Sequence, residues 1–227
     1  MQTEIFLVRH GEPVLQNALL GSTDSPLSEN GWQQLKESSA RLKNVDQVIA
    51  SPLARCAHFA QDFAEENTLP LLIDNNWREC HFGDWDGEFY LDLHQAYPEA
   101  VSAFFSDPGR NTPPNGETLV EFSGRIEAAI HDTHRQFQGQ KIIVFTHAGV
   151  IRNIVAWCLQ MDYLSGFQFR RFAVDYASVT HLSIYHEDKI YPQLMNLNWT
   201  IESVYRKNES NITKHTSSKS TSSQGNS

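Results

Sequence analysis

The sequence predicts an α/β fold with three layers: a mainly parallel sheet, helices on both of its faces, and a helical insertion that caps a site at the sheet edge. Three short apolar runs, at residues 5–8, 48–50 and 142–145, have the composition of buried strands. Each run is followed by a segment with helical spacing of apolar residues, at 28–43, 51–66 and 148–160. Alternating strands and helices are typical of a parallel sheet covered by helices.

The predicted helices carry their own start and spacing signals. The segment at 28–43 places Trp32 and Leu35 among polar residues. The segment at 51–66 begins with Ser51 as the expected cap and Pro52 at the first helical position.

The pattern changes between residues 77 and 137, which we interpret as an insertion covering the sheet edge and the site. Short helices are expected at 88–106, a loop rich in proline, glycine and asparagine at 107–116, and one longer helix at 117–137. Beyond the third predicted strand–helix pair, alternation of apolar and polar residues at 178–185 and 190–196 predicts a terminal hairpin.

Composition excludes several classes of partner. The chain has 227 residues, 40% of them hydrophobic and 20% charged, which is an ordinary globular balance. A formal net charge of −9 argues against binding to nucleic acid or to an acidic membrane surface. No apolar stretch approaches the ~20 residues that span a bilayer, and the N-terminus lacks the basic and apolar segments of a signal peptide.

Cysteine content and the C-terminal segment complete this first description. Three cysteines, an odd number without zinc-site spacing, favour a reduced, cytoplasmic protein. Residues 207–227 are almost entirely polar, which predicts a disordered tail after a domain at 1–206. The sequence leaves open whether the protein is a monomer or a homodimer.

The most informative motif is Arg9-His10-Gly11-Glu12, directly after the first predicted strand. Ligands of open α/β sheets bind just beyond the carboxyl ends of strands. A cation beside an imidazole there indicates an anion site that contains a nucleophile. Taken alone, the motif is more often a charged strand end followed by a turn.

Three further segments support the anion site. They are Ser51-Pro52-Leu53-Ala54-Arg55 after the second strand, Glu79 with Phe82-Gly83-Asp84-Trp85-Asp86-Gly87, and Thr146-His147-Ala148-Gly149 after the third strand. Singly, Arg55 and Glu79 are more often solvated and His147 is more often a core histidine. Two histidines and two arginines at neighbouring strand ends are, however, costly to assemble without an anion to bind.

Together these residues resemble the histidine phosphatase superfamily, which has the phosphoglycerate-mutase-like fold, and within it the bacterial α-ribazole phosphatase branch. The resemblance covers roughly residues 4–200. It depends on the motifs already quoted and on Asp24-Ser25-Pro26-Leu27-Ser28 with Gly31, Arg78 before Glu79, Pro114-Asn115-Gly116-Glu117, and Val150.

The resemblance implies a mechanism and a set of roles. His10 is the expected nucleophile, attacking phosphorus to form a phosphohistidine that water then hydrolyses. Arg9, Arg55 and His147 are expected to hold the phosphoryl oxygens and, with any proton on His147, to lower the pKa of His10. Glu79 is the expected general acid for the leaving group. It is pulled two ways, since arginines favour its ionised form while burial and a bound phosphate favour its protonated form.

One loop departs from the family pattern. The family usually has threonine two residues after the motif glycine and asparagine six residues after the nucleophilic histidine, where this chain has Pro13 and Gln16. Either Gln16 or Asn17 could supply the phosphate contact, together with Gly21 and Ala148.

No cofactor or metal is expected. Consecutive residues of an extended segment cannot all point inward, which argues against Glu79-Cys80-His81 as a ligand cluster.

The substrate is expected to be a small phosphomonoester. Aromatic residues crowd the segment around Glu79: Trp77, Phe82, Trp85, Phe89 and Tyr90. They are either core and lid packing or a stacking wall for an aromatic nucleoside phosphate. The branch resemblance implies α-ribazole 5′-phosphate and cobalamin biosynthesis. The alternatives are a broad-specificity or sugar-phosphate phosphatase, a cofactor-dependent phosphoglycerate mutase, and an inactive protein that binds a phosphorylated ligand.

Overall fold

The computed structural model describes residues 1–200, so the predicted tail at 207–227 and the end of the predicted 1–206 domain lie outside the described residues. Its centre is a six-stranded sheet in the order β3-β2-β4-β1-β5-β6. The strands are β1 (Gln2–Arg9), β2 (Gln47–Ala50), β3 (Leu71–Ile73), β4 (Lys141–Thr146), β5 (Val179–His186) and β6 (Ile190–Trp199).

The sheet is parallel in its middle and antiparallel at one side. β1 and β2 both pair in parallel with β4, and β3 pairs in parallel with β2. β5 runs antiparallel to β1, and β6 runs antiparallel to β5, which confirms the predicted terminal hairpin. The three predicted core strands therefore lie side by side, and their carboxyl ends share one edge.

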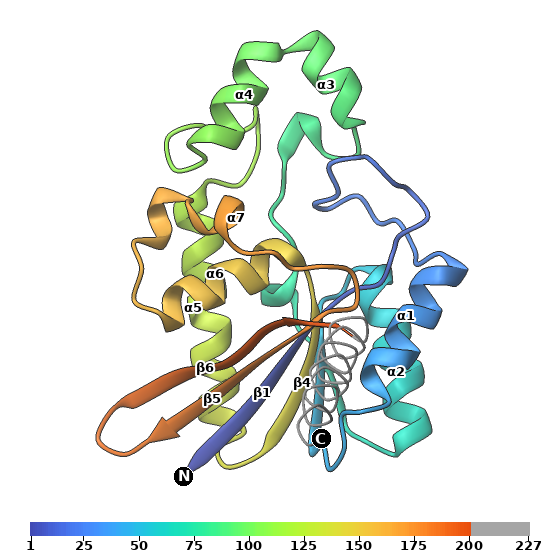
Figure 1. The fold of residues 1–227 in the computed structure, drawn as a ribbon, viewed down its shortest axis with the longest axis vertical. Coiled ribbons are helices and arrows are strands. Elements are labelled where there is room, and N and C mark those ends of the chain that lie inside the picture. The colour runs from blue at the N-terminus through green and yellow to red at the C-terminus, as the bar shows by residue number, and fades with distance from the viewer. Residues whose placement is uncertain (201–227) are drawn as a thin grey trace, which may run out of the picture.

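Helices cover both faces of the sheet, as predicted (Figure 1). Along β4, Ile142 and Val144 belong to one core, and Ile143 and Phe145 belong to the other, because successive strand residues face opposite sides. α1 (Glu29–Ser39) and α2 (Ala54–Asn67) pack on one face. α5 (Leu119–Gln136) and α6 (Ala148–Cys158) pack on the other.

The region predicted as an insertion divides into two parts. α3 (Tyr90–Ala96) and α4 (Pro98–Ser106) form a cap beyond the carboxyl ends of the strands (Figure 1), around a small core that includes Leu93 and Val101. α5 instead packs on α6 and the sheet. The prediction that all of 77–137 covers the edge and the site holds within α5 only for the first turn, where Leu119 and Phe122 line a cavity. The rest of its apolar stripe completes a main layer.

The start of the second helix also differs from its prediction. α2 begins at Ala54, and Leu53 is its cap residue in extended conformation. Ser51 and Pro52 are therefore not its cap and first helical position. Ser51 Oγ lies 2.7 Å from His147 Nε2 and also accepts from Leu53 N at 3.3 Å. Asp24 caps the helix from outside by accepting from Ala54 N at 2.6 Å.

Several short elements escaped prediction. They are β3, the 3₁₀ turns Asn75–Trp77, Gly83–Trp85 and Tyr163–Ser165, and α7 (Gln168–Arg171). None exceeds four residues, which is too short for a periodic pattern to appear. Among the described residues, no helix is long and apolar enough to cross a membrane.

Candidate active site

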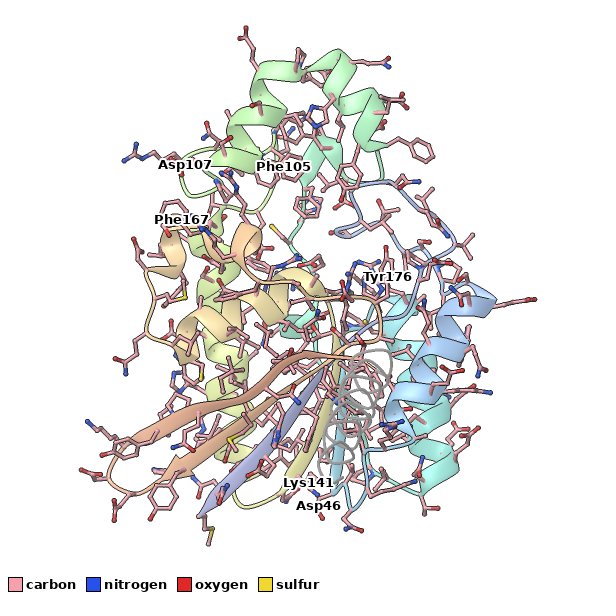
Figure 2. All side chains as sticks on the ribbon, viewed as in Figure 1. Asp46, Phe105, Asp107, Lys141, Phe167 and Tyr176 are labelled. Atoms are coloured by element: carbon pink, nitrogen blue, oxygen red, sulfur yellow. The ribbon has the colours of Figure 1, made fainter. Side chains whose placement is uncertain are left out.

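The carboxyl ends of three neighbouring strands bring the predicted polar residues together. His10 follows β1, Ser51 follows β2 and His147 follows β4. Backbone hydrogen bonds tie these ends to one another: His10 N donates to Thr146 O at 2.9 Å, and Ser51 N donates to Phe145 O at 3.0 Å. Tyr176 lies at this end of the sheet, whereas Asp46 and Lys141 mark the opposite end (Figure 2).

The imidazole of His10 is held in one orientation. It is 6% exposed, and its Nδ1 lies 2.7 Å from Gly11 O. A carbonyl oxygen can only accept, so Nδ1 carries the proton and the lone pair of the neutral ring is on Nε2. Burial, with the charges of Arg55 and Arg9, holds the pKa of His10 well below its ordinary value of 6.5. The ring is therefore a neutral base with a free nitrogen.

Arg9 presents a guanidinium with unused donors. Its Nη1 donates to Val174 O at 2.6 Å, and the guanidinium carbon lies 3.9 Å above the ring centre of Tyr176. Its Nε is buried and has no partner among the described residues. Burial lowers the pKa of Arg9, against the opposing effect of Tyr176. An unpartnered buried donor of this kind favours the arrival of an anion.

Arg55 is fully buried, and most of its N–H groups donate to other groups of the protein. Its Nη2 donates to Leu20 O and Gly21 O, at 3.1 and 2.9 Å, and its Nη1 donates to Thr23 O at 2.9 Å. Its Nε donates to His147 Nδ1 at 3.3 Å. Because a guanidinium has five N–H donors, one N–H on Nη1 has no partner among the described residues.

The contact with Arg55 defines the state of His147. A guanidinium N–H can only donate, so Nδ1 of His147 accepts, and Nε2 carries the proton that it donates to Ser51 Oγ. Burial, Arg55 and His10 together lower the pKa of His147 well below 6.5. His147 is thus a neutral ring, and the effect expected from a proton on it is absent. The rings of His10 and His147 meet edge to face with centroids 5.3 Å apart.

Glu79 lies against the first turn of α6. Its Oε2 accepts from Gly149 N at 2.9 Å, and its Oε1 accepts from Cys80 N at 3.1 Å. A Cβ on Gly149 would lie 2.3 Å from Oε1, so only glycine lets the carboxyl group approach the helix this closely. The positive end of the helix dipole also favours a carboxylate here.

A cavity of about 350 Å³ lies beside Arg9, His10 and Glu79. Arg9, His10, Asn17, Glu79 and Ala148 line it, whereas Gln16, Gly21, Arg55 and His147 are not among its lining residues. Most of the remaining wall is apolar and aromatic, and it includes Phe104 and Phe105 of the cap and Phe122 of α5. Phe105 belongs to α4 of the cap, whereas Tyr176 lies nearer the sheet (Figure 2). The cavity therefore has polar groups at the strand ends and a largely aromatic wall on the side of the cap, which Asn111, Thr112 and Arg170 also line.

The loop that departs from the family pattern has a defined geometry. Gln16 and Asn17 are both exposed, but only Asn17, which has a positive φ of 58°, is among the residues that line the cavity. Gly21 donates its N–H to Asp86 at 3.2 Å, and its carbonyl accepts from Arg55. Of the two candidates for the phosphate contact, the cavity thus favours Asn17.

Several cavity residues were missed from the sequence, among them Arg152, Arg170 and Tyr176. Arg152 lies four residues after Ala148 on α6, and this spacing, which places both on one helix face, could have found it. Its Nε donates to Phe172 O at 2.8 Å, and no carboxylate among the described residues forms an ion pair with it. Tyr176 precedes β5 and reaches the site only through the antiparallel pairing of β5 with β1. Nothing local in the sequence indicates it.

The Glu79-Cys80-His81 segment has other partners. His81 Nδ1 lies 3.3 Å from Asp86 Oδ2, and Glu79 bonds backbone N–H groups. Burial raises the pKa of the Cys80 thiol, which keeps it protonated and a poor metal ligand. Within residues 1–200, no group of three or more His, Cys, Asp and Glu side chains is arranged to hold a metal ion.

Comparison with known proteins gives concordant matches. A family model described as histidine phosphatase superfamily (branch 1) matches residues 5–199. The chain is 32% identical over 170 residues to the adenosylcobalamin/alpha-ribazole phosphatase of Salmonella typhimurium, covering 73% of this chain and 84% of the relative. It is 33% identical over 159 residues to a metal-independent phosphoserine phosphatase of Arabidopsis thaliana, covering 67% of each. The solved alpha-ribazole phosphatase from Shigella flexneri matches with a TM-score of 0.74 and 29% identity, over 86% of this chain and 96% of that one.

Alanine at position 149 is expected to displace Glu79. The new Cβ would overlap Oε1, and kcat/KM for a phosphomonoester should fall about 100-fold, as for an ångström-scale misplacement of a catalytic group. Gly124→Ala on α5 is the matched control, because a Cβ there meets no atom within 4 Å. Wild-type activity in Gly149→Ala would contradict the placement of Glu79.

The buried neutral state of His147 predicts a pH-dependent stability. Below pH 6.5 the unfolded chain binds a proton at this position and the folded protein does not, so the free energy of unfolding falls as the pH falls. The slope from this group is about 1.4 kcal/mol per pH unit, down to the folded-state pKa. Urea unfolding between about pH 5 and pH 7 should show a shallower slope in His147→Gln than in the wild type. Equal slopes would contradict the assignment.

Proposed function

The chain belongs to the histidine phosphatase superfamily, and we propose that it is a metal-independent phosphomonoesterase that forms a phosphohistidine on His10 and acts on α-ribazole 5′-phosphate in cobalamin biosynthesis. The observation that carries the proposal is the hydrogen bond between Nδ1 of His10 and Gly11 O. This bond leaves the Nε2 lone pair of a neutral imidazole for attack on phosphorus.

The first step transfers the phosphoryl group. Nε2 of His10 forms a bond to phosphorus as the bond to the ester oxygen breaks, and the alcohol leaves with a proton from Glu79. The unused N–H groups of Arg9 and the remaining N–H of Arg55 stabilise the charge on the phosphoryl oxygens. His147 acts indirectly: its neutral ring accepts a hydrogen bond from Arg55 and so helps to orient that guanidinium.

The second step returns the enzyme to its starting state. Water attacks the phosphohistidine, the Glu79 carboxylate takes a proton from that water, and the nitrogen–phosphorus bond breaks to release inorganic phosphate. Glu79 must hold a proton when substrate is bound to act as the acid of the first step. The N–H groups of Cys80 and Gly149 keep it beside the cavity for both steps.

The shape of the cavity supports a leaving group with a large aromatic part. Tyr90, Phe104 and Phe105 surround the side of the cavity away from the strand ends. An aromatic base could pack against these rings while its 5′-phosphate reaches His10. The 31–32% identity to adenosylcobalamin/alpha-ribazole phosphatases also supports this substrate.

A second candidate is an acidic phosphomonoester such as O-phosphoserine. Arg152 favours it, since this half-buried guanidinium faces the cavity without an ion pair among the described residues. Burial lowers the pKa of Arg152, and the charge of Glu79 opposes this lowering, so the two groups interact. When Glu79 holds a proton, a carboxylate on the leaving group would replace its charge.

A trapping experiment tests the phosphohistidine. Mixing the full-length protein with substrate labelled in its phosphoryl group and denaturing it in base should yield labelled protein whose label is lost in acid. His10→Asn should abolish the label, while His58→Asn, at an exposed position on α2, should keep it. An acid-stable label, or an undiminished label in His10→Asn, would contradict the mechanism.

A substrate panel tests the leaving group. We expect kcat/KM for α-ribazole 5′-phosphate to exceed that for p-nitrophenyl phosphate by about 100-fold, equivalent to ~2.7 kcal/mol of transition-state binding. Equal values would exclude the aromatic base as a recognised group. A preference for O-phosphoserine that disappears in Arg152→Met would favour the second candidate. Interconversion of phosphoglycerates would instead identify a mutase.

A further inference from the structure

We infer that Asp86 is a positioning residue for the phosphate site, because its carboxylate holds the loop at residues 20–23 and this loop in turn holds Arg55. Asp86 belongs to the Phe82–Gly87 motif, for which the proposed mechanism has no use. The inference rests on the proposed function only in taking phosphate as the anion that Arg55 serves.

The carboxylate of Asp86 collects backbone N–H groups. Oδ1 accepts from Gly21 N at 3.2 Å and from Thr23 N at 2.8 Å. Oδ2 accepts from Ser22 N at 2.7 Å and from Phe82 N at 3.2 Å. The side chain is 8% exposed. Burial opposes its ionisation, but hydrogen bonds from Thr23, Ser22 and Phe82 lower the pKa of Asp86 below its ordinary value.

Two peptide groups connect this carboxylate to the guanidinium of Arg55. In the peptide between residues 20 and 21, the N–H of Gly21 donates to Asp86, and the carbonyl of Leu20 accepts from Arg55. In the next peptide, the N–H of Ser22 donates to Asp86, and the carbonyl of Gly21 accepts from Arg55. The N–H and C=O of a trans peptide point in opposite directions. Both peptides therefore span the space between the two charges, and each charge polarises them in the same sense.

Gly21 is the position that allows this arrangement. A Cβ there would lie 2.2 Å from Cys80 O and 2.4 Å from Asp86 Oδ2. Any other residue would push the carboxylate away from the loop. The role of Gly21 is thus to let Asp86 approach.

Displacement of the loop would reach the phosphate site through Arg55. Three of the four bonds that fix its guanidinium go to the loop carbonyls, and the fourth goes to His147. Without Asp86, those carbonyls would lose their orientation, and the one N–H left for a ligand would lose its direction.

The sign of the effect separates positioning from simple electrostatics. Asp86 is an anion in the same protein region as a phosphate site, so removing its charge should strengthen phosphate binding if it acted only through Coulomb repulsion. A positioning role requires the opposite: phosphate should bind more weakly when the carboxylate is lost.

A calorimetric titration of the full-length protein with inorganic phosphate tests the inference without any turnover. We expect Asp86→Asn to raise the dissociation constant for phosphate by roughly 10- to 100-fold. Asp84→Asn is the matched control, because Asp84 is exposed, lies in the same turn, and bonds only Asn115 through its side chain. Asp86→Glu, which keeps the charge but lengthens the side chain, should also weaken binding and covers the case in which Asp86→Asn does not fold.

A double-mutant cycle with Arg55→Lys tests the route. If Asp86 acts through Arg55, Asp86→Asn should change the dissociation constant little in the Arg55→Lys background. Additive effects, or phosphate binding by Asp86→Asn and Asp86→Glu as tight as in the wild type, would overturn the inference. Failure to trap a phosphoenzyme would count against the proposed function and would leave these binding outcomes unaffected.

Discussion

A guanidinium without access to solvent is the constraint on which the site depends. Arg55 carries a charge in the interior, and none of the ion pairs among the described residues involves it. Burying a charge is unfavourable unless it is fully hydrogen-bonded. Three loop carbonyls and one imidazole nitrogen meet that need, and in doing so they fix the path of a loop and the protonation of a histidine.

The hydrogen bonds of the two imidazole rings explain why both rings are neutral. Gly11 O requires a proton on Nδ1 of His10, and Arg55 requires a lone pair on Nδ1 of His147. Two neighbouring arginines make a further positive charge unfavourable at either ring. A neutral imidazole nitrogen can therefore persist among cations, which is the combination that the proposed phosphoryl transfer to His10 needs.

Local signals in the sequence were sufficient for the architecture of the sheet and for the residues at its edge. Apolar runs predicted β1, β2 and β4, and the polar residues after them fall at one edge because those strands are neighbours and parallel. The signals failed where a distant residue decides. Ser51 does not cap α2, since the helix begins at Ala54 and the N–H of that residue donates to Asp24, 30 positions away. Tyr176 reaches Arg9 only because a late strand pairs with the first. Three of the four hydrogen bonds of Arg55 likewise go to a loop more than 30 residues earlier.

The residues at the strand ends and the aromatic residues of the cap come from different parts of the fold, which affects how selectivity can change. Groups suited to handling phosphorus come from the strand ends and the helix starts beside them, whereas Phe104 and Phe105 come from a cap with a small core of its own. The core of the cap includes Leu19 and Trp85, which adjoin the loop and the carboxylate that hold Arg55, so substitutions in that core would also reach the buried charges. Substitutions at the exposed Phe105 would mainly reshape the opening. Preference among ester groups can therefore diverge through side chains at the opening, such as Phe105, while the residues around His10 keep their contacts.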